Sequence, residues 1–286
     1  MNTGNEDIKK SFSARTGVRF NPQSSLMISF NESISSNING YNIDIRSTTR
    51  DYIAFGSYLS EGLPFSNWSL RVGGLENISF IKPYVSSMSM EHAFNGKQNL
   101  SWKFNEGGVT PINLLSISSF ENNNNDNLQF SRISRSFSPL IGISTTFNNG
   151  ISTNVRSNIT HTLDEVANGL TYISDNSILA TITYNFSKGI RFSLPFSERN
   201  IYLRNNMNIS LNLDFSNKTE EGSKDKINFV EQNFTNTQKS ILRITYTLTD
   251  DITGSLFYEY RETDTRLTGR RIDRDFGINL NVAIRG

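Results

Sequence analysis

The feature of this sequence that most limits its fold is an alternation of apolar and polar residues over its second half. A period of two places successive side chains on opposite faces of a β-strand. The alternation recurs in seven segments, residues 141–147, 151–159, 178–186, 207–215, 242–248, 252–260 and 276–284. In the clearest, Met207, Ile209, Leu211, Leu213 and Phe215 alternate with Asn208, Ser210, Asn212 and Asp214. The pattern predicts seven amphipathic strands.

The apolar phase of these strands carries no charge. It holds 33 positions and none is charged, although charged residues make up 19% of the chain. The opposite phase carries Arg156, Asp214, Arg243 and Glu259 among Asn, Ser, Thr and Gly. A soluble sandwich buries such an apolar face, whereas a membrane barrel turns it toward lipid. Alternation alone therefore leaves both architectures open.

The composition suits a wall around water better than a globular interior. Hydrophobic residues make up only 36% of the chain, while Asn, Ser and Thr together number 97 and aromatics reach 11%. A barrel wall needs apolar residues only at every second position, because its lumen and loops can be polar. The absence of cysteine excludes disulfides and thiolate sites, and a net charge of +1 gives no basic field for nucleic acid. The N-terminus has no apolar signal segment, and no run is long enough for a membrane helix.

Connection lengths favour the membrane barrel. The predicted connections 148–150 and 249–251 are short, and 162–177, 216–240 and 262–274 are long. Outer-membrane barrels have short turns on one side of the membrane and long loops on the other, and aromatic girdles at both boundaries. The predicted short connections fall on one side of the membrane and the long ones on the other, provided that residues 187–206 form a periplasmic excursion or contain an extra strand pair. With strands of about 10 residues, the whole chain would hold roughly 12–14 strands.

The first half is less regular. Residues 12–20 and 26–30 predict a hairpin around Asn21-Pro22, and residues 88–94 and 100–104 predict another around Asn95-Gly96. Gly73-Gly74 fits a strand bend or bulge. Residues 122–125, four asparagines, read as a polar loop tip.

Several motifs resemble the C-terminal part of the SprA family (also called Sov), very large outer-membrane translocon barrels of the type IX secretion system. The residues that carry the resemblance are Pro64, Asn67-Trp68, Gly74-Leu75 and Phe80-Ile81-Lys82, then Ser136-Phe137-Ser138-Pro139-Leu140-Ile141-Gly142-Ile143 with Asn148-Asn149-Gly150, and later Asn205-Asn206-Met207-Asn208, Leu256-Phe257-Tyr258-Glu259 and Phe276-Gly277-Ile278-Asn279-Leu280. The similarity covers residues 64–286, whereas residues 1–63 match less well. The chain is far shorter than a SprA protein and ends on Ile284-Arg285-Gly286, where the family ends on an aromatic residue or leucine.

The resemblance implies an all-β, antiparallel transmembrane β-barrel wall over residues 1–286, as a segment of a larger barrel in a bacterial outer membrane. It implies a polar conduit that exports cargo proteins, in a system linked to gliding motility. The partners would be the lipid bilayer with its lipopolysaccharide, secreted cargo, and accessory plug and gating proteins. The residues expected to line the lumen are Arg156, Asn208, Asn212, Asp214, Arg243, Glu259, Asn279 and Asn281.

Other classes of protein remain as alternatives. A different outer-membrane transporter or porin barrel would close alone and conduct ions, and a soluble β-sandwich adhesin would extract without detergent. We expect no enzyme, metal site or cofactor, because nothing forms a nucleophile–base–orienter set. His92 and His161, the only histidines, read as rim or wall residues. The charges at 220–226 and 269–274 read as solvated loops, the latter with lipopolysaccharide phosphate as a weaker alternative.

Overall fold

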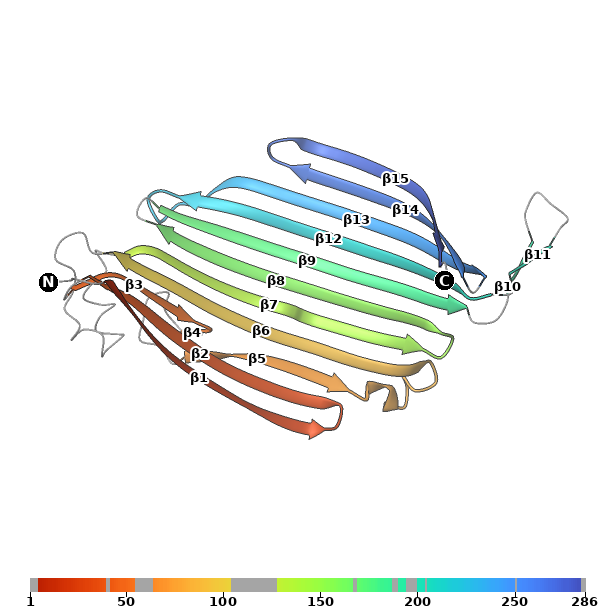
Figure 1. The fold of residues 1–286 in the computed structure, drawn as a ribbon, viewed down its shortest axis with the longest axis horizontal. Coiled ribbons are helices and arrows are strands. Elements are labelled where there is room, and N and C mark those ends of the chain that lie inside the picture. The colour runs from red at the N-terminus through yellow and green to blue at the C-terminus, as the bar shows by residue number, and fades with distance from the viewer. Residues whose placement is uncertain are drawn as a thin grey trace.

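The computed structural model of the protein describes residues 5–39, 42–54, 64–103, 128–166, 169–186, 190–193, 200–203, 205–249 and 251–283. These residues are almost entirely extended (Figure 1). The strands are β1 (Asn5–Asn21), β2 (Ser24–Asn39), β3 (Asn42–Arg50), β4 (Tyr52–Ala54), β5 (Pro64–Gly73), β6 (Val85–Lys103), β7 (Leu128–Phe147), β8 (Ile151–Val166), β9 (Gly169–Phe186), β10 (Ile190–Ser193), β11 (Asn200–Leu203), β12 (Met207–Ser223), β13 (Val230–Thr249), β14 (Ile252–Thr265) and β15 (Gly269–Val282). A single 3-10 turn, η1 (Leu75–Asn77), follows β5.

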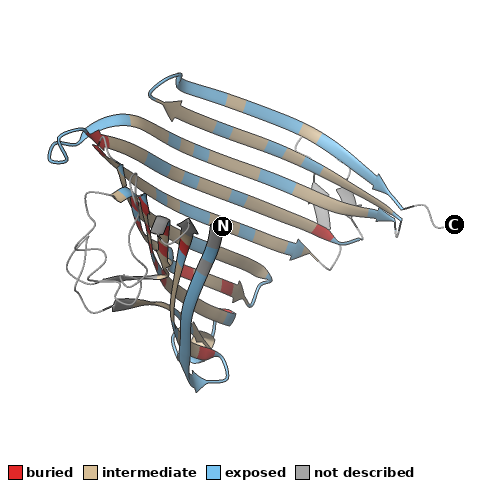
Figure 2. Cartoon of the chain, turned by 60° about the vertical axis from the view of Figure 1, so that its left-hand side comes forward, coloured by how far each residue is buried: buried red, intermediate tan, exposed pale blue. Residues whose placement is uncertain are grey.

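Thirteen of these strands form one antiparallel sheet. The order is β15-β14-β13-β12-β9-β8-β7-β6-β3-β2-β5-β4, and β1 pairs with β2. Among the described strands, β1 pairs only with β2 and β15 only with β14, so these residues show an open sheet with two long edges. The sheet is strongly curved, as the two views in Figures 1 and 2 show.

All seven strands predicted from the alternation are present, as the parts of β7, β8, β9, β12, β13, β14 and β15 that the structure describes. The excursion between β9 and β12 contains the extra strand pair anticipated as one possibility, β10 with β11, and β9 pairs directly with β12. Residues 284–286 and the asparagine run 122–125 lie outside the described residues.

The prediction of long loops was wrong. β8 continues to Val166 and β9 begins at Gly169, β12 continues to Ser223 and β13 begins at Val230, and β14 and β15 are separated only by residues 266–268. These segments have polar residues on both faces, so they lack the alternation by which strands were recognised. Their backbones nevertheless stay paired to the ends of the hairpins, with one register shift at Glu220/Glu221 in the β12–β13 hairpin. Loop length therefore cannot serve as an argument for a membrane barrel in this chain.

In the N-terminal half one hairpin was predicted correctly and one was not. β1 and β2 pair around Asn21-Pro22, as expected. The predicted turn at Asn95-Gly96 does not exist, because β6 runs without interruption from Val85 to Lys103. Gly96 is buried in that strand, and its backbone N–H donates to Asn67 Oδ1 of β5 at 2.6 Å. Gly96 is therefore a paired strand residue and not part of a turn.

Two short strands share one position in the sheet between β2 and β6. β3 pairs with one half of β2 and of β6, and β5 pairs with the other half of each. Both run antiparallel to β2, so together they fill one strand position of the sheet. Between them the chain bends at Asp51 into β4, which pairs with the start of β5. Gly73-Gly74 ends β5, and Gly74 has a φ of 79°, so the pair marks a strand end rather than a bulge.

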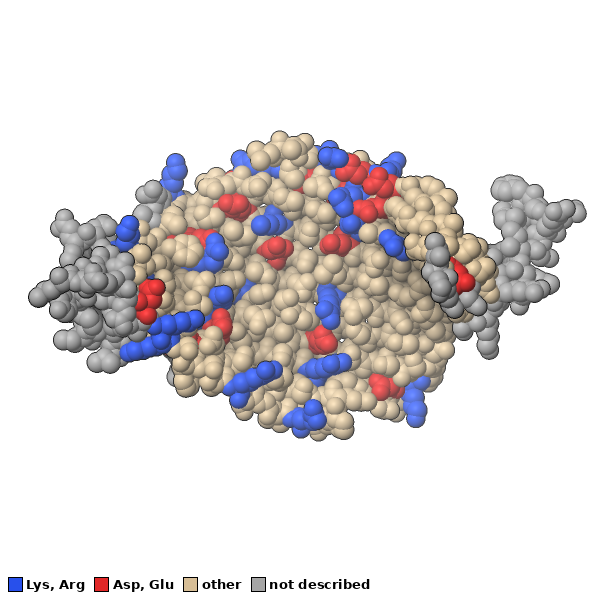
Figure 3. Space-filling view, viewed as in Figure 1, with Lys and Arg blue, Asp and Glu red and all other residues tan. Residues whose placement is uncertain are grey.

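The two sides of the sheet differ sharply. We call the side that carries Met207, Leu211 and Phe215 the apolar face, and the opposite side the polar face. Directly opposed residues in antiparallel strands point to the same side, and the registers place the apolar phases of all seven predicted strands on the apolar face. The edges of the sheet bend toward the viewer of Figure 1, and the same view in Figure 3 shows acidic and basic side chains across the middle of the sheet. The polar face is thus the concave one.

The apolar face stays exposed over β13, β14 and β15, whereas Met207 on β12 and Phe94 and Leu100 on β6 are buried on the same side. Large side chains stay exposed along it, for example Phe276 at 65%, Ile278 at 72% and Leu280 at 62% (Figure 2). A soluble sandwich would bury these residues against a second sheet. The described residues also contain no helix with the length and apolar character needed to cross a bilayer.

Candidate functional site: the polar face

All eight residues predicted to line a lumen lie on the polar face. They come from five strands of one side of the sheet, four of them consecutive and the fifth, β8, separated from these by β9. Arg156 lies on β8, Asn208, Asn212 and Asp214 on β12, Arg243 on β13, Glu259 on β14, and Asn279 and Asn281 on β15. Directly opposed residues of paired strands point to the same side, and by this rule the strand registers place all eight side chains on one side of the sheet. That this side lines a lumen remains a prediction.

Amide and hydroxyl side chains on this face bond to one another across neighbouring strands. Asn208 Nδ2 donates to Asn185 Oδ1 at 2.6 Å, and Thr181 Oγ1 donates to Asn212 Oδ1 at 2.9 Å. Asn154 Nδ2 donates to Ser144 Oγ at 2.8 Å. These short polar side chains keep spare donors and acceptors for water. The chemistry is that of a wetted surface.

One register row concentrates the charge of the polar face. The row contains one residue from each of eleven strand positions, and each residue stands directly opposite the next. Eight of the eleven are charged, five basic and three acidic. The row consists of Arg19, Ser25, Arg71, Glu91, Gly142, Arg156, Leu179, Asp214, Lys239, Arg261 and Asp273. The signs are mixed, so this row creates no strong field of one sign.

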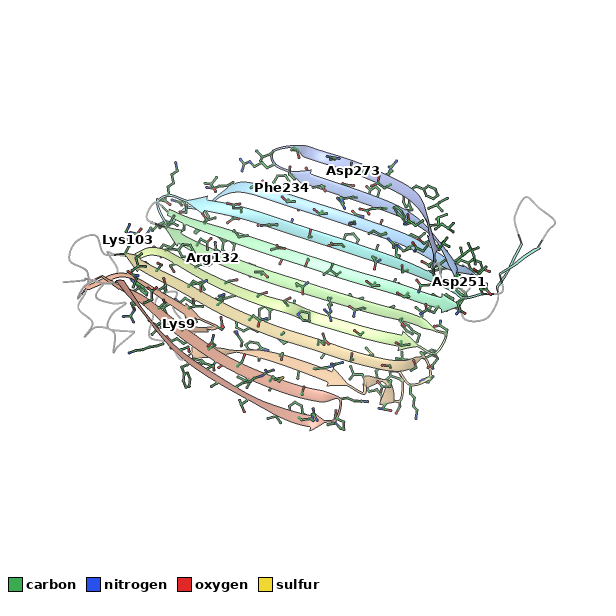
Figure 4. The ribbon with its side chains drawn as sticks, viewed as in Figure 1. Lys9, Lys103, Arg132, Phe234, Asp251 and Asp273 are labelled. Carbon is green, nitrogen blue, oxygen red and sulfur yellow. The ribbon has the colours of Figure 1, made fainter. Side chains whose placement is uncertain are left out.

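Ion pairs form within this row and between the row and its neighbours. Arg156 Nη2 lies 3.3 Å from Glu91 Oε2, and Glu259 Oε1 lies 3.1 Å from Lys239 Nζ and 2.8 Å from Arg261 Nη2. Toward the left end of the sheet in Figure 4, Arg132 makes two contacts of 2.6 Å with the Asp164 carboxylate on the neighbouring strand. The row itself was not found from the sequence, because it becomes visible only when the strand registers are known.

Strand β7 contains two extra residues relative to both neighbours. Phe137 pairs with Ile159 and Phe94, but the next paired positions on β7 are Ile141 with β8 and Gly142 with β6. The bulge holds the cis peptide bond between Ser138 and Pro139. It therefore falls within the Ser-Pro-Leu-Ile-Gly run that carries part of the family resemblance.

Both histidines lie within strands of the sheet, His92 in β6 and His161 in β8. His92 Nδ1 lies 2.6 Å from the Leu140 carbonyl oxygen, and its ring is 6.0 Å from that of Trp68. His161 Nδ1 lies 2.7 Å from the hydroxyl of Tyr172, against whose ring it stacks at 5.8 Å. Within the described part of the chain, no group of three His, Asp or Glu side chains could hold a metal ion.

The two charged segments predicted as solvated loops are mostly strand ends and a tight turn. Arg270 and Arg271 belong to β15 and pair with Glu262 at 2.6 Å and Asp273 at 2.9 Å. Lys226 lies in the turn after β12 and pairs with Glu165 at 2.7 Å. These basic groups already have carboxylate partners, which weakens the lipopolysaccharide-phosphate alternative for residues 269–274.

Comparison with known proteins adds no identification. No family model matches the chain, and no curated protein matches it. The similarity to the SprA family therefore rests on the motifs in the sequence alone.

Proposed function

We propose that this chain forms part of the wall of an outer-membrane channel of the SprA type, which exports proteins through a polar lumen. The polar face would line the conduit, and the apolar face would contact lipid. Cargo proteins, plug and gating proteins and the surrounding lipopolysaccharide would be its partners. The wall would be passive, with energy supplied elsewhere in the secretion system.

The observation that carries this proposal is an uncharged apolar band of limited height. On β12 the apolar face runs from Met207 through Phe215 and then changes to Asn217, Thr219 and Glu221. About 10 residues of strand span about 33 Å. Tilted by roughly 40°, they span about 25 Å along the membrane normal, the height of the apolar band of outer-membrane barrels.

The upper edge of this band supports the same tilt. The first charged or imidazole side chain above the band is Arg274 on β15 and His161 on β8, so the band ends at Phe276 and at Ile159, five strands away. The register row through Phe276 meets β8 at Thr153, six residues before Ile159. Six residues correspond to about 20 Å along a strand, and five strand spacings to about 24 Å. The ratio of the first distance to the second is the tangent of the strand tilt, which is about 40° and lies within the roughly 35–45° of outer-membrane barrels.

Cysteine scanning tests this proposal cleanly, because the chain has no cysteine of its own. Single cysteines are placed at Leu211 and Leu213 on the apolar face and at Asn212 and Asp214 on the polar face, and the protein is reconstituted in lipid vesicles. A water-soluble maleimide should label the second pair and not the first. Equal labelling of both pairs, or full solubility without detergent, would contradict the membrane wall and favour a soluble protein.

Single-channel recording distinguishes a wall segment from a complete transporter barrel. With two long edges unpaired in the described residues, the chain alone should give no stable unitary conductance in a planar bilayer. A stable, reproducible conductance would show that the chain closes by itself and would favour a porin-like transporter.

A further inference from the structure

The apolar face contains a groove of about 540 Å³ at the upper edge of the apolar band. It crosses five neighbouring strands, from β8 to β14, and combines two kinds of lining. On the side of the band lie Ile159, Ile178 and Phe215, of which Ile178 is 50% and Phe215 40% exposed. Above them the lining consists of amides and carboxylates.

The polar lining is an ordered row. Asn176 on β9, Asn217 on β12 and Asn236 on β13 occupy consecutive positions of one register row, which continues to Asp264 on β14. Asn217 Nδ2 donates to Asn236 Oδ1, which fixes the orientation of this pair. Each amide presents both donors and acceptors, and each carboxylate presents acceptors only.

The charge of the groove disfavours an anionic ligand. Its charged lining residues are Glu262 and Asp264. Arg270, a basic neighbour, is engaged with Glu262, its Nε lying 2.6 Å from Oε1. Amides and carboxylates next to an aromatic ring suit uncharged hydroxyl groups, whereas a phosphate would meet carboxylates.

We propose that this groove binds the saccharide headgroup of a glycolipid, with the acyl chains lying along the apolar band below it. This inference rests on the proposed function, because the groove coincides with the lipid–water boundary only if the apolar face contacts lipid. Sugar hydroxyls would bond to the amides of Asn176, Asn217 and Asn236, and the ring of Phe215 would contact the C–H face of the sugar.

The test uses lipid nanodiscs of phosphatidylcholine that contain a minor fraction of glucosyl-diacylglycerol. Native mass spectrometry then counts the lipids that stay bound to the full chain. The wild-type protein should enrich the glycolipid by about tenfold over the bulk ratio, which corresponds to about 1.4 kcal/mol. Replacing both Asn217 and Asn236 with Ala should return the ratio to that of the bulk. A double replacement of Asn95 and Asn185 on the polar face, matched in chemistry, should leave the enrichment unchanged.

Each outcome bears on one proposal. If the double variant does not insert, Asn176→Ala alone should reduce the enrichment severalfold. Insertion without glycolipid enrichment, or preferential retention of phosphatidylglycerol added in its place, would overturn the saccharide site and leave the membrane wall intact. Failure of the wild-type chain to insert would overturn the membrane wall itself.

Discussion

Arg156 of β8 and Glu91 of β6 form an ion pair across an intervening strand, with Arg156 Nη2 3.3 Å from Glu91 Oε2. The strand between them, β7, contributes Gly142 at the same register position. A side chain there would stand between the two charged groups. Glycine therefore allows a contact between strands that are not neighbours.

A side chain at Gly142 should destabilise the wall. A Cβ atom would lie 3.0 Å from Pro139 Cγ and 3.5 Å from Glu91 Cβ, so Gly142→Val should lower the free energy of unfolding by about 1–3 kcal/mol. Urea unfolding of the vesicle-inserted protein measures this. The control is Gly254→Val on β14, where the nearest atom to a Cβ is Leu248 Cδ1 at 3.6 Å. Equal stability of the two variants would contradict the crowding argument.

An arginine in the middle of the apolar band should cost much more than one beyond it. Leu211→Arg should lower the free energy of unfolding in vesicles by about 2–4 kcal/mol, because the guanidinium would lie near mid-bilayer. Thr219→Arg, on the same strand and face but above the band, should change it by less than about 1 kcal/mol. A similar cost at both positions would show that the band does not mark the membrane.

Removing the acceptor for Gly96 should weaken the join between β5 and β6. The Gly96 N–H is buried and donates to Asn67 Oδ1 at 2.6 Å. Asn67→Ala leaves that donor without its partner, and we expect a loss of about 1–3 kcal/mol in urea unfolding. Ser69→Ala, exposed on the same face of β5, should be neutral, and a cost equal to that of Asn67→Ala would refute the role of this bond.

The turn after β12 should keep its order in mild acid. Asp225 accepts hydrogen bonds from the backbone N–H groups of Ile227 at 3.0 Å and Asn228 at 2.8 Å, from Asn228 Nδ2 at 2.6 Å and from Ser223 Oγ at 2.9 Å. These bonds, led by the backbone N–H of Asn228, hold the pKa of Asp225 well below its ordinary value. Its contribution to stability is therefore present above the ordinary pKa of about 4 and is lost only as the pH falls through the lowered value.

Hydrogen exchange at Ile227 and Asn228 measures this effect. Protection of both amides should be constant from neutral pH down to about pH 4 and should fall only in stronger acid. Asp225→Ala should remove the protection at every pH, whereas Lys224→Ala should leave it unchanged. Loss of protection in the wild type already near pH 5 would contradict the lowered pKa.

The alternation was enough to predict the strands that carry the apolar band. Leu211 and Leu213 show that a phase is visible in sequence when one face of a strand must be apolar. Above the band that requirement ends, so the polar stretch from Asn217 to Ser223 was taken for a loop although it remains paired. The turn predicted at Asn95-Gly96 was wrong for another reason. The local turn preference of these two residues is outweighed by the pairing of β6 with the strands on both of its sides.

The candidate site divides in the same way. The sequence phase was sufficient to place Asn208, Asn212 and Arg243 on one face. The contact of Arg156 with Glu91 and the groove around Asn217 depend on which residues stand opposite one another in neighbouring strands. Those registers are set by bulges such as the one at Ser138-Pro139, which no local pattern reveals.

Because β3 and β5 share one strand position, the sheet can accept insertions between them. Each piece is held in register by both β2 and β6, independently of the chain that joins Ala54 to Pro64. The shear of a barrel depends on strand registers and not on the length of such a connection. We therefore expect that extra residues, or an entire inserted module, can enter at this point without altering the strand registers of the sheet.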